Sequence, residues 1–400
     1  MLDSNSIQEL IKDVAETTGF VIAEEDSLMN SCIKVTTPLY VLNCIYGGGL
    51  PLGIISEISG PPSSGKSTFL YQCMGNYQKE YPDGIPVVYD MEASWDNDRM
   101  KLLGIDTSKV LRMRSSSIES AFGNMFKILN KIEKIKEEQN KDISSFQIYD
   151  SISTGGTEKQ HKAADEGNSA FGVGSMMEAP RIIKQNLSNV LPYLEKFPVY
   201  IGLINQVFVS PGMYVSKVES GGGFGLKHIC HTHITFGENK DTWANGFIDG
   251  TTSMVKLSKS KLSPKFMEIP CYMDAKRSGR IDEVKSFIDY IIKDNVGFIK
   301  AKAWWNMGDT INEIILQYPQ LDSRKDELSK YTRNYRKDDM ISLIREDKDL
   351  INLLQIHLID FINNIYPGQK SITDPYKNKL INDCKYFDTD IEGSVNSIDE

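Results

Sequence analysis

Residues 54–67 carry the stretch IISEISGPPSSGKS, and the prediction of the fold starts there. Its first six residues, 54–59, are apolar or small at most positions and predict a buried strand, while a helical pattern begins near Ser67. Between them the chain matches GxxxxGK followed by Ser or Thr, with Gly60, Pro61, Pro62, Ser63, Ser64, Gly65, Lys66 and Ser67, and Thr68 comes next. A strand, a glycine-rich loop and a helix in this order predict a phosphate-binding loop.

The residue types of this loop suit a nucleoside triphosphate. Glycines allow main-chain N–H groups to wrap the β-phosphate, and the N-terminus of the following helix adds partial positive charge. Lys66 is expected to neutralise oxygens of the β- and γ-phosphates, and Ser67 to ligate Mg²⁺. An ordinary glycine-rich turn before a helix is the alternative, and the complete match in the right context favours the phosphate site.

Composition places the chain among ordinary globular proteins. Its 400 residues suggest two or three domains, and 40% hydrophobic with 25% charged residues excludes fibrous and wholly disordered classes. The net charge of −9 argues against a protein that coats nucleic acid with its whole surface, so any such site must be local. No apolar run is long enough for a membrane span, and six cysteines without a CxxC pair suit a reducing compartment.

The order of patterns predicts an α/β core with a mostly parallel sheet. Strands are expected at 54–59, 86–90, 146–150 and 199–205, with an amphipathic helix over 118–132 that Ser116 or Ser117 caps. A short helical stripe precedes this core, and charged helical segments follow it. We therefore predict an N-terminal arm (1–34), a core (35–274) and a smaller helical C-terminal domain (275–400) that ends in an acidic tail. The arm either packs on the edge of the core or docks on a neighbouring subunit.

Polar residues at the ends of the expected strands are candidates for the chemistry of hydrolysis. Asp150 ends a strand that we expect beside the loop strand, where it would act on the Mg²⁺ side. Asp90 and Glu92 are expected to point to the same side, and Glu92 to hold and deprotonate a water, unless both are simply solvated. Gln206 ends the last strand, and its amide can donate to a γ-phosphate, although a turn amide is the plainer interpretation.

Two irregular stretches follow strand ends, where open α/β sheets bind their ligands. They span 151–174 and 207–226, and the second contains five glycines. Segments of this length in a compact domain are usually functional or mobile.

The chain resembles the RecA family of recombinases, including bacterial RecA and the UvsX-type phage members, over roughly residues 35–306. The resemblance rests on the run GGGLPLGIISEI at 47–58 leading into GPPSSGKS, followed by Asp90-Met91-Glu92 and Leu103-Gly104-Ile105-Asp106. It implies a RecA-like P-loop ATPase core that uses ATP and Mg²⁺. It also implies a DNA-dependent ATPase that forms helical filaments on single-stranded DNA and exchanges strands with a homologous duplex in recombination and repair. Single-strand-binding and mediator proteins are possible partners, no membrane is involved, and the compartment is the cytoplasm of a bacterial or phage-infected cell.

The resemblance also implies roles for particular residues. Glu92 matches the catalytic glutamate, Asp150 the Walker B aspartate and Gln206 the sensor of the γ-phosphate. Asp96 and Arg99 fall among the nucleotide-binding positions, with Arg99 where the family carries a tyrosine over adenine. The remaining correspondences are two lysines that reach a neighbour's γ-phosphate, Lys259 and Lys261, and two DNA-binding loops, 151–174 and 207–226.

Without the family, the lysine-rich run 256–266 indicates a basic edge strand. His228, Cys230, His231 and His233 would alternate on a strand and so could not converge on zinc. Two other functions stay open: a RecA-fold ring ATPase of the helicase type, and a DNA-binding mediator that uses ATP only as an assembly switch.

Overall fold

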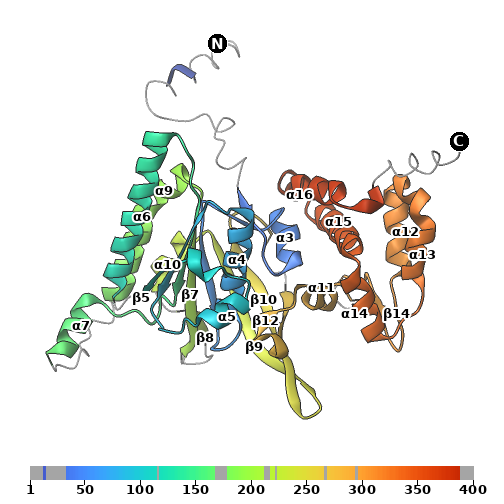
Figure 1. Ribbon diagram of the computed structural model, residues 1–400, viewed down its shortest axis with the longest axis horizontal. Coiled ribbons are helices and arrows are strands. Elements are labelled where there is room, and N and C mark those ends of the chain that lie inside the picture. Colours follow the sequence, from blue (N-terminus) through green and yellow to red (C-terminus); the bar gives the residue numbers. More distant parts are fainter. Residues whose placement is uncertain are drawn as a thin grey trace, which may run out of the picture.

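The structure is a computed structural model that describes residues 12–14, 33–114, 117–166, 178–210, 217–220, 223–264, 268–292 and 296–387. A ten-stranded sheet forms its centre, in the order β12-β11-β10-β9-β3-β7-β6-β4-β5, with β8 paired to β7 (Figure 1). The strands are β3 (Ile55–Gly60), β4 (Ile85–Asp90), β5 (Leu111–Arg114), β6 (Ser145–Asp150), β7 (Val199–Ser210), β8 (Lys217–Ser220), β9 (Thr232–Ala244), β10 (Phe247–Ser260), β11 (Glu268–Asp274) and β12 (Arg280–Ile281).

Six neighbouring strands, from β9 through β3, β7, β6 and β4 to β5, run parallel. The prediction of an α/β fold with a mostly parallel sheet is therefore confirmed, and the four expected strands lie within a residue of their expected starts. One expectation is wrong: the strand that carries Asp150 does not lie beside the loop strand, because β7 lies between β6 and β3. Crossover helices allow a chain to skip a position in the sheet, so sequence order alone does not fix strand order.

The other part of the sheet is antiparallel and was not foreseen. β9 and β10 form a long hairpin, and β11 and β12 continue from β10. The hairpin projects from the molecule (Figure 1), and Trp243 and Phe247 are exposed near its turn. The lysine-rich run covers the end of β10, where Lys256 pairs with both β9 and β11, whereas Leu257, Lys259 and Ser260 pair with β9. The interpretation as an edge strand therefore does not hold at Lys256 and stays a prediction for the rest of the run.

Helices cover both faces of the sheet because alternate strand residues are apolar on both sides. One apolar cluster joins Ile58 and Val88 to α4 (Lys66–Glu80), and the other joins Ile55 and Tyr89 to α6 (Ile118–Gln139) and α9 (Glu178–Lys196). Ser117 caps α6, since its side chain accepts a hydrogen bond from the Ser120 main-chain N–H. The predicted cap of this helix is therefore confirmed at Ser117.

The two stretches expected to be irregular contain regular structure. Residues 158–165 form α7 (Glu158–Asp165), which begins with a capping box made by Thr157 and Gln160. The second stretch contains the end of β7, strand β8 and the start of α10 (Gly223–Ile229), with β7 and β8 antiparallel. Residues 167–177, 211–216 and 221–222 lie outside the described part.

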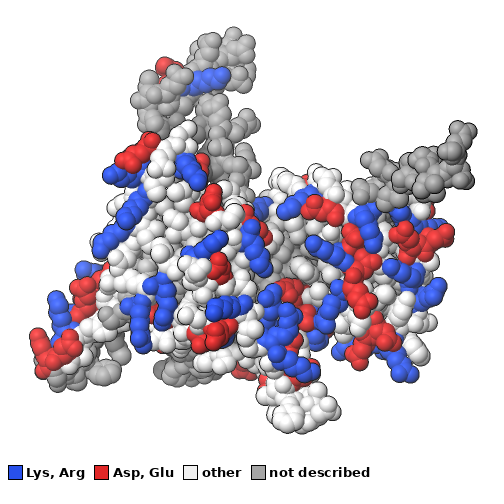
Figure 2. Space-filling model, viewed as in Figure 1, with Lys and Arg blue, Asp and Glu red and all other residues white. Residues whose placement is uncertain are grey.

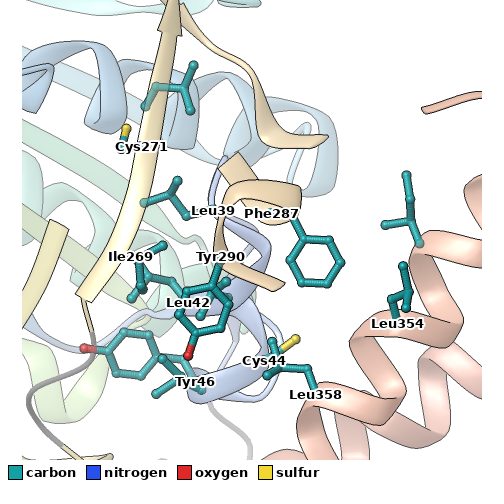
Figure 3. Close-up of a cluster of buried hydrophobic side chains, with 14 of the residues drawn as sticks. Leu39, Leu42, Cys44, Tyr46, Ile269, Cys271, Phe287, Tyr290, Leu354 and Leu358 are labelled. Atoms are coloured by element: carbon teal, nitrogen blue, oxygen red, sulfur yellow. The ribbon is translucent and has the colours of Figure 1, made fainter. Parts of the chain in front are cut away.

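The C-terminal part is helical, as expected. Its helices are α11 (Glu283–Ile291), α12 (Gly308–Gln317), α13 (Lys325–Ser329), α14 (Lys337–Glu346), α15 (Lys348–Ile365) and α16 (Lys370–Asn382). Three of them, α11, α15 and α16, pack on α3 (Tyr40–Tyr46), where Leu42 and Cys44 share one buried cluster with Phe287 of α11 and Leu354 of α15 (Figure 3). The predicted boundaries at 34 and 274 therefore stay predictions. The acidic tail at 388–400, and the arm except for residues 12–14 and 33–34, lie outside the described residues.

Charged side chains of both signs are interspersed on the face seen in Figure 2, in keeping with a local rather than a general nucleic-acid site. No helix within the described ranges combines the length and apolarity needed to cross a lipid bilayer.

Candidate nucleotide-binding site

The loop between β3 and α4 has a backbone that only glycine accommodates at its key positions. Gly65, directly before α4, has φ +98°, and a Cβ there would lie 2.5 Å from the sulfur of Met273. A Cβ on Gly60 would lie 2.6 Å from the main-chain oxygen of Phe236. The two glycines of the sequence pattern thus correspond to two places where the chain turns tightly against β9 and β11.

The loop borders a pocket of about 420 Å³, a size typical of small-molecule sites. It is lined by eight residues that the sequence identified, Ser63, Ser64, Gly65, Lys66, Ser67, Thr68, Glu92 and Arg99, and by six that it did not, Tyr71, Ser94, Thr251, Met273, Ala275 and Gly279. Four of the six come from β10 (Thr251), β11 (Met273) and the turn after β11 (Ala275 and Gly279), which no local sequence pattern connects to the loop.

The other predicted binding positions lie near the pocket without lining it. Gly60, Pro61 and Pro62 form the first part of the loop, and Asp96 caps α5 (Asn97–Leu102) through a 2.7 Å hydrogen bond from the Arg99 main-chain N–H. The Arg99 guanidinium donates to the Thr68 hydroxyl at 3.2 Å, which holds it against the start of α4.

Lys66 is buried at the base of the pocket. Its Nζ donates to the main-chain oxygen of Pro61 at 2.6 Å and lies 3.5 Å from the Ser64 hydroxyl. Burial lowers the pKa of the ammonium, although the carboxylates of Glu92 and Asp150 act in the opposite direction. A polyanion in the pocket would stabilise the charged form.

Asp150, at the end of β6, contacts two residues that line the pocket, even though β6 is not beside β3. Ser67 Oγ lies 3.3 Å from its Oδ1, and the Tyr71 hydroxyl donates to its Oδ2 at 2.8 Å. Burial raises the pKa of Asp150 to about 6, against the opposing effect of the Tyr71 hydrogen bond. A buried carboxylate beside a hydroxyl offers the oxygen ligands that Mg²⁺ prefers, and a cation would offset the cost of the buried charge. The residues present therefore fit Mg²⁺.

Tyr71 was missed, although the sequence contains a signal for it. It lies four residues after Ser67, and positions i and i+4 share one face of a helix. A side chain at position 71 therefore lies on the same face of α4 as Ser67, and both contact the Asp150 carboxylate.

Glu92, which follows β4, is contacted from the end of β6 and from within β7, since β7 continues past Gln206 to Ser210 and does not close at Gln206 as expected. The Ser151 hydroxyl donates to Glu92 Oε1 at 2.8 Å, and Gln206 Nε2 donates to the same oxygen at 3.1 Å. Asp90 does not share this side, contrary to expectation, since it pairs with Arg112 at 2.6 Å. The strand ends at Asp90 and the chain then turns, with Ala93 at φ +54°, so the alternation of a strand no longer applies.

Lys259 and Lys261 do not line this pocket. Lys259 Nζ donates to the main-chain oxygens of Lys227, His228 and Cys230 at 2.5, 3.2 and 2.7 Å, at the C-terminal end of α10. Lys261 is exposed just beyond β10. Any contact of these lysines with a triphosphate must therefore involve another copy or a rearrangement.

The histidines near β9 serve the fold differently from the alternating strand we expected. His228 belongs to α10, while His231 precedes β9 and its Nδ1 accepts a 3.2 Å hydrogen bond from the Ile55 main-chain N–H. Burial lowers the pKa of His231 to about 4, which keeps that nitrogen unprotonated near neutral pH.

A parallel sheet with a glycine-rich loop between strand and helix, a lysine, and carboxylates at neighbouring strand ends defines a P-loop nucleoside-triphosphate-binding protein. A model described as the RecA N-terminal domain matches residues 7–273, so the chain belongs to the RecA family. The predicted family is confirmed.

Curated relatives named Protein RecA agree with this placement at low identity. The chain is 26% identical to the one from Malacoplasma penetrans over 313 residues, covering 78% of this chain and 88% of the relative. It is 25% identical to that of Nautilia profundicola over 346 residues, covering 84% and 93%, and 28% identical to that of Helicobacter acinonychis over 294 residues, covering 73% and 79%.

Proposed function

We propose that this protein is a DNA-dependent ATPase that forms helical filaments on single-stranded DNA and promotes homologous pairing and strand exchange. One observation carries the proposal: Lys66, Ser67 and Glu92 line one pocket in a RecA-family chain, and Asp150 and Gln206 lie within hydrogen-bond distance of Ser67 and Glu92, respectively. We infer further that it acts in recombination and DNA repair in the cytoplasm, where single-strand-binding and mediator proteins are candidate partners.

ATP is the proposed substrate, with its phosphates on the loop 60–67. Main-chain N–H groups and Lys66 would hold the phosphates, and Arg99 would lie over the base. Ser67 and Asp150 would hold Mg²⁺, which supplies positive charge to the phosphate oxygens when it is bound.

Glu92 is the proposed general base. It would orient a water and accept its proton while the water oxygen bonds to the γ-phosphorus and the bond to the leaving ADP oxygen breaks. Ser151 and Gln206 both donate to Oε1, and we therefore assign the water to Oε2. Gln206 would contact the γ-phosphate when it is present, and this contact would affect the part of β7 that follows Gln206.

Assembly is proposed to complete the site. Lys261 would reach the γ-phosphate held by a neighbouring copy, and Lys259 would do so after leaving the carbonyl groups of α10. Residues 151–174 and 207–226 are the proposed DNA-binding segments, and 1–34, 35–274 and 275–400 the proposed arm, core and C-terminal domain.

The test combines two measurements on the full chain. We expect ATP turnover to rise on addition of single-stranded DNA, and electron microscopy with a slowly hydrolysed ATP analogue to show helical filaments on the DNA. Discrete rings would instead support a ring motor, and negligible turnover on DNA would support an assembly switch. Either result would overturn the proposal.

A further inference from the structure

Glu57 is a buried carboxylate in the middle of β3 that the proposed hydrolysis does not use. It is 1% exposed, in a strand whose six residues are all buried. Burying a charge is costly, and an apolar residue of similar size commonly gives equal or greater stability. A charge at this position therefore calls for a role beyond packing.

The partners of Glu57 lie on both neighbouring strands. Asn205 Nδ2, on β7, donates to Glu57 Oε1 at 2.7 Å, and His233 Nδ1, on β9, lies 3.1 Å from Oε2. His233 is the residue paired with Glu57 in the β3–β9 register. One carboxylate thus links the three central strands.

On the β7 side this link leads to the nucleotide pocket. Gln206 follows Asn205 directly, and its Nε2 donates to Glu92 Oε1 at 3.1 Å. Successive side chains of a strand point to opposite faces. Fixing Asn205 toward Glu57 therefore fixes the direction in which Gln206 leaves the strand.

On the β9 side the link leads to α10. Lys259 is paired with His233 in the β9–β10 register, and its ammonium holds three main-chain oxygens at the C-terminal end of α10. These are the oxygens that a helix end leaves without helical partners, and a cation there is stabilising. Burial and the nearby Lys259 lower the pKa of His233 to about 4, so the imidazole is uncharged near neutral pH.

We propose that Glu57 is a positioning residue that couples the nucleotide pocket to helix α10. Through Asn205, Glu57 fixes the direction of the Gln206 side chain. Through His233, it holds β9 at the position where β9 pairs with Lys259 of β10. β7 and α10 are the elements at the two ends of the proposed second DNA-binding segment. Glu57 would therefore affect both the response to nucleotide and the contact with DNA. The inference rests on the proposed DNA-dependent ATPase.

The test is Glu57→Gln, which keeps the size of the side chain and an acceptor for Asn205 but removes the charge facing His233. We expect the stimulation of turnover by single-stranded DNA to fall about tenfold, within the range of allosteric couplings. Affinity for a fluorescent ATP analogue without DNA should stay within about twofold of wild type, because the loop contacts are intact. Hydrogen exchange of α10 should respond to the analogue in wild type and not in the variant.

Two further variants keep the test independent of folding failures. His233→Asn, whose Nδ2 can donate from nearly the place of Nδ1, should retain DNA stimulation, whereas His233→Leu should lose it. Asp360→Asn is the matched control, since it removes another buried carboxylate, one that accepts from Tyr318 and Lys377 in the helical part. It should lower the melting temperature without changing the stimulation ratio.

The outcomes separate this inference from the proposed function. Folded Glu57→Gln and His233→Leu proteins with wild-type stimulation and wild-type exchange of α10 would overturn the coupling. If DNA does not stimulate wild-type turnover, the proposed function fails, and the exchange response to the analogue alone still decides whether Glu57 couples the two elements.

Discussion

Asp150 ends β6 and Glu92 lies two residues after the end of the neighbouring strand β4, yet their surroundings assign them different chemistry. Glu92 follows β4 and receives two donors on one oxygen, whereas Asp150 is buried with Tyr71 and Ser67. The first can hold a water and the second a cation, because only the second carries a buried charge that a metal would offset.

Replacing Glu92 by Gln tests the proposed base. The amide keeps the size of the side chain but cannot accept a proton, so DNA-stimulated turnover should fall about 10²- to 10⁴-fold, while affinity for the ATP analogue is retained. Steady-state turnover and fluorescence titration measure the two quantities. Ser94→Ala, which changes another residue of the pocket wall, is the control and should stay near wild type. Unchanged turnover of the Glu92 variant would remove this residue from catalysis.

Asp150→Asn should stabilise the nucleotide-free protein at neutral pH. The folded-state pKa is raised from 3.8 to about 6, so the folded state holds a proton that the unfolded state has released between these values. The cost of the carboxylate therefore grows as pH rises from 3.8 to 6 and is fully present above 6, where a shift of about two pKa units corresponds to about 3 kcal/mol. Denaturant unfolding at pH 7.5 should show the gain, and unfolding at pH 4 should not. Mg²⁺-dependent nucleotide binding should be lost.

Asp347→Asn is a control for which we expect the opposite change in the free energy of unfolding. Burial raises the pKa of Asp347, but hydrogen bonds from Tyr331 and Tyr386 outweigh that effect and lower it to about 2. This carboxylate stabilises the fold at neutral pH, and that stabilisation is lost as pH falls through about 2. Its replacement should therefore destabilise at pH 7.5. Equal or lower stability of Asp150→Asn at that pH would contradict the interpretation of Asp150 as a buried, costly charge.

At the scale of elements, the strand–loop–helix unit depends on backbone geometry as much as on side chains. Gly65→Ala would place a Cβ at φ +98° and 2.5 Å from the Met273 sulfur. We expect affinity for the ATP analogue to fall more than about tenfold, because the strain of roughly 1–3 kcal/mol displaces the loop N–H groups. Adding Met273→Ala should not restore binding, since it removes the close contact and leaves the strained φ.

Gly246→Ala separates backbone strain from crowding. Gly246 has φ +80° in the β9–β10 turn, and a methyl group added there would meet open space. This variant should lose about 1 kcal/mol of stability and bind nucleotide as wild type does. If Gly65→Ala behaves in the same way, the loop does not need its glycine for phosphate binding.

Local sequence patterns predicted that most core helices and strands exist, but they did not predict which elements lie beside one another. The strands at 86–90 and 146–150 and the helix capped by Ser117 follow from apolar period and capping. The β9–β12 extension has mixed polar residues and β-bulges, which weaken the alternation that would identify it. For the same reason, no pattern indicated that Thr251 and Met273 complete the pocket.

At the scale of the whole molecule, the pocket and the two proposed trans lysines lie at different places on one chain. A head-to-tail assembly joins such places between copies, and one interface repeated without closure gives a helical polymer. The proposed activity therefore belongs to an assembly rather than to a single chain.

Mixing two inactive variants tests this directly. Glu92→Gln lacks the base, and Lys261→Ala lacks the cation offered to a neighbour, so each alone should turn over ATP slowly. In an equal mixture, about a quarter of the interfaces of a head-to-tail polymer pair an intact Glu92 with an intact Lys261. Turnover on DNA should recover toward that fraction of wild type. The sum of the two separate rates, with no recovery, would place both residues in one chain's site.

The sequence by itself determined the strand–loop–helix unit at 54–67, the strand ends beside Glu92 and Asp150, and the family, because these depend on short spacings and local periodicity. Only the tertiary structure decided that β7 separates β6 from β3, that Tyr71, Thr251 and Met273 complete the pocket, and that Glu57 joins Asn205 to His233. These features depend on which distant segments become neighbours, and that choice is made by burial over the whole sheet rather than by any local pattern.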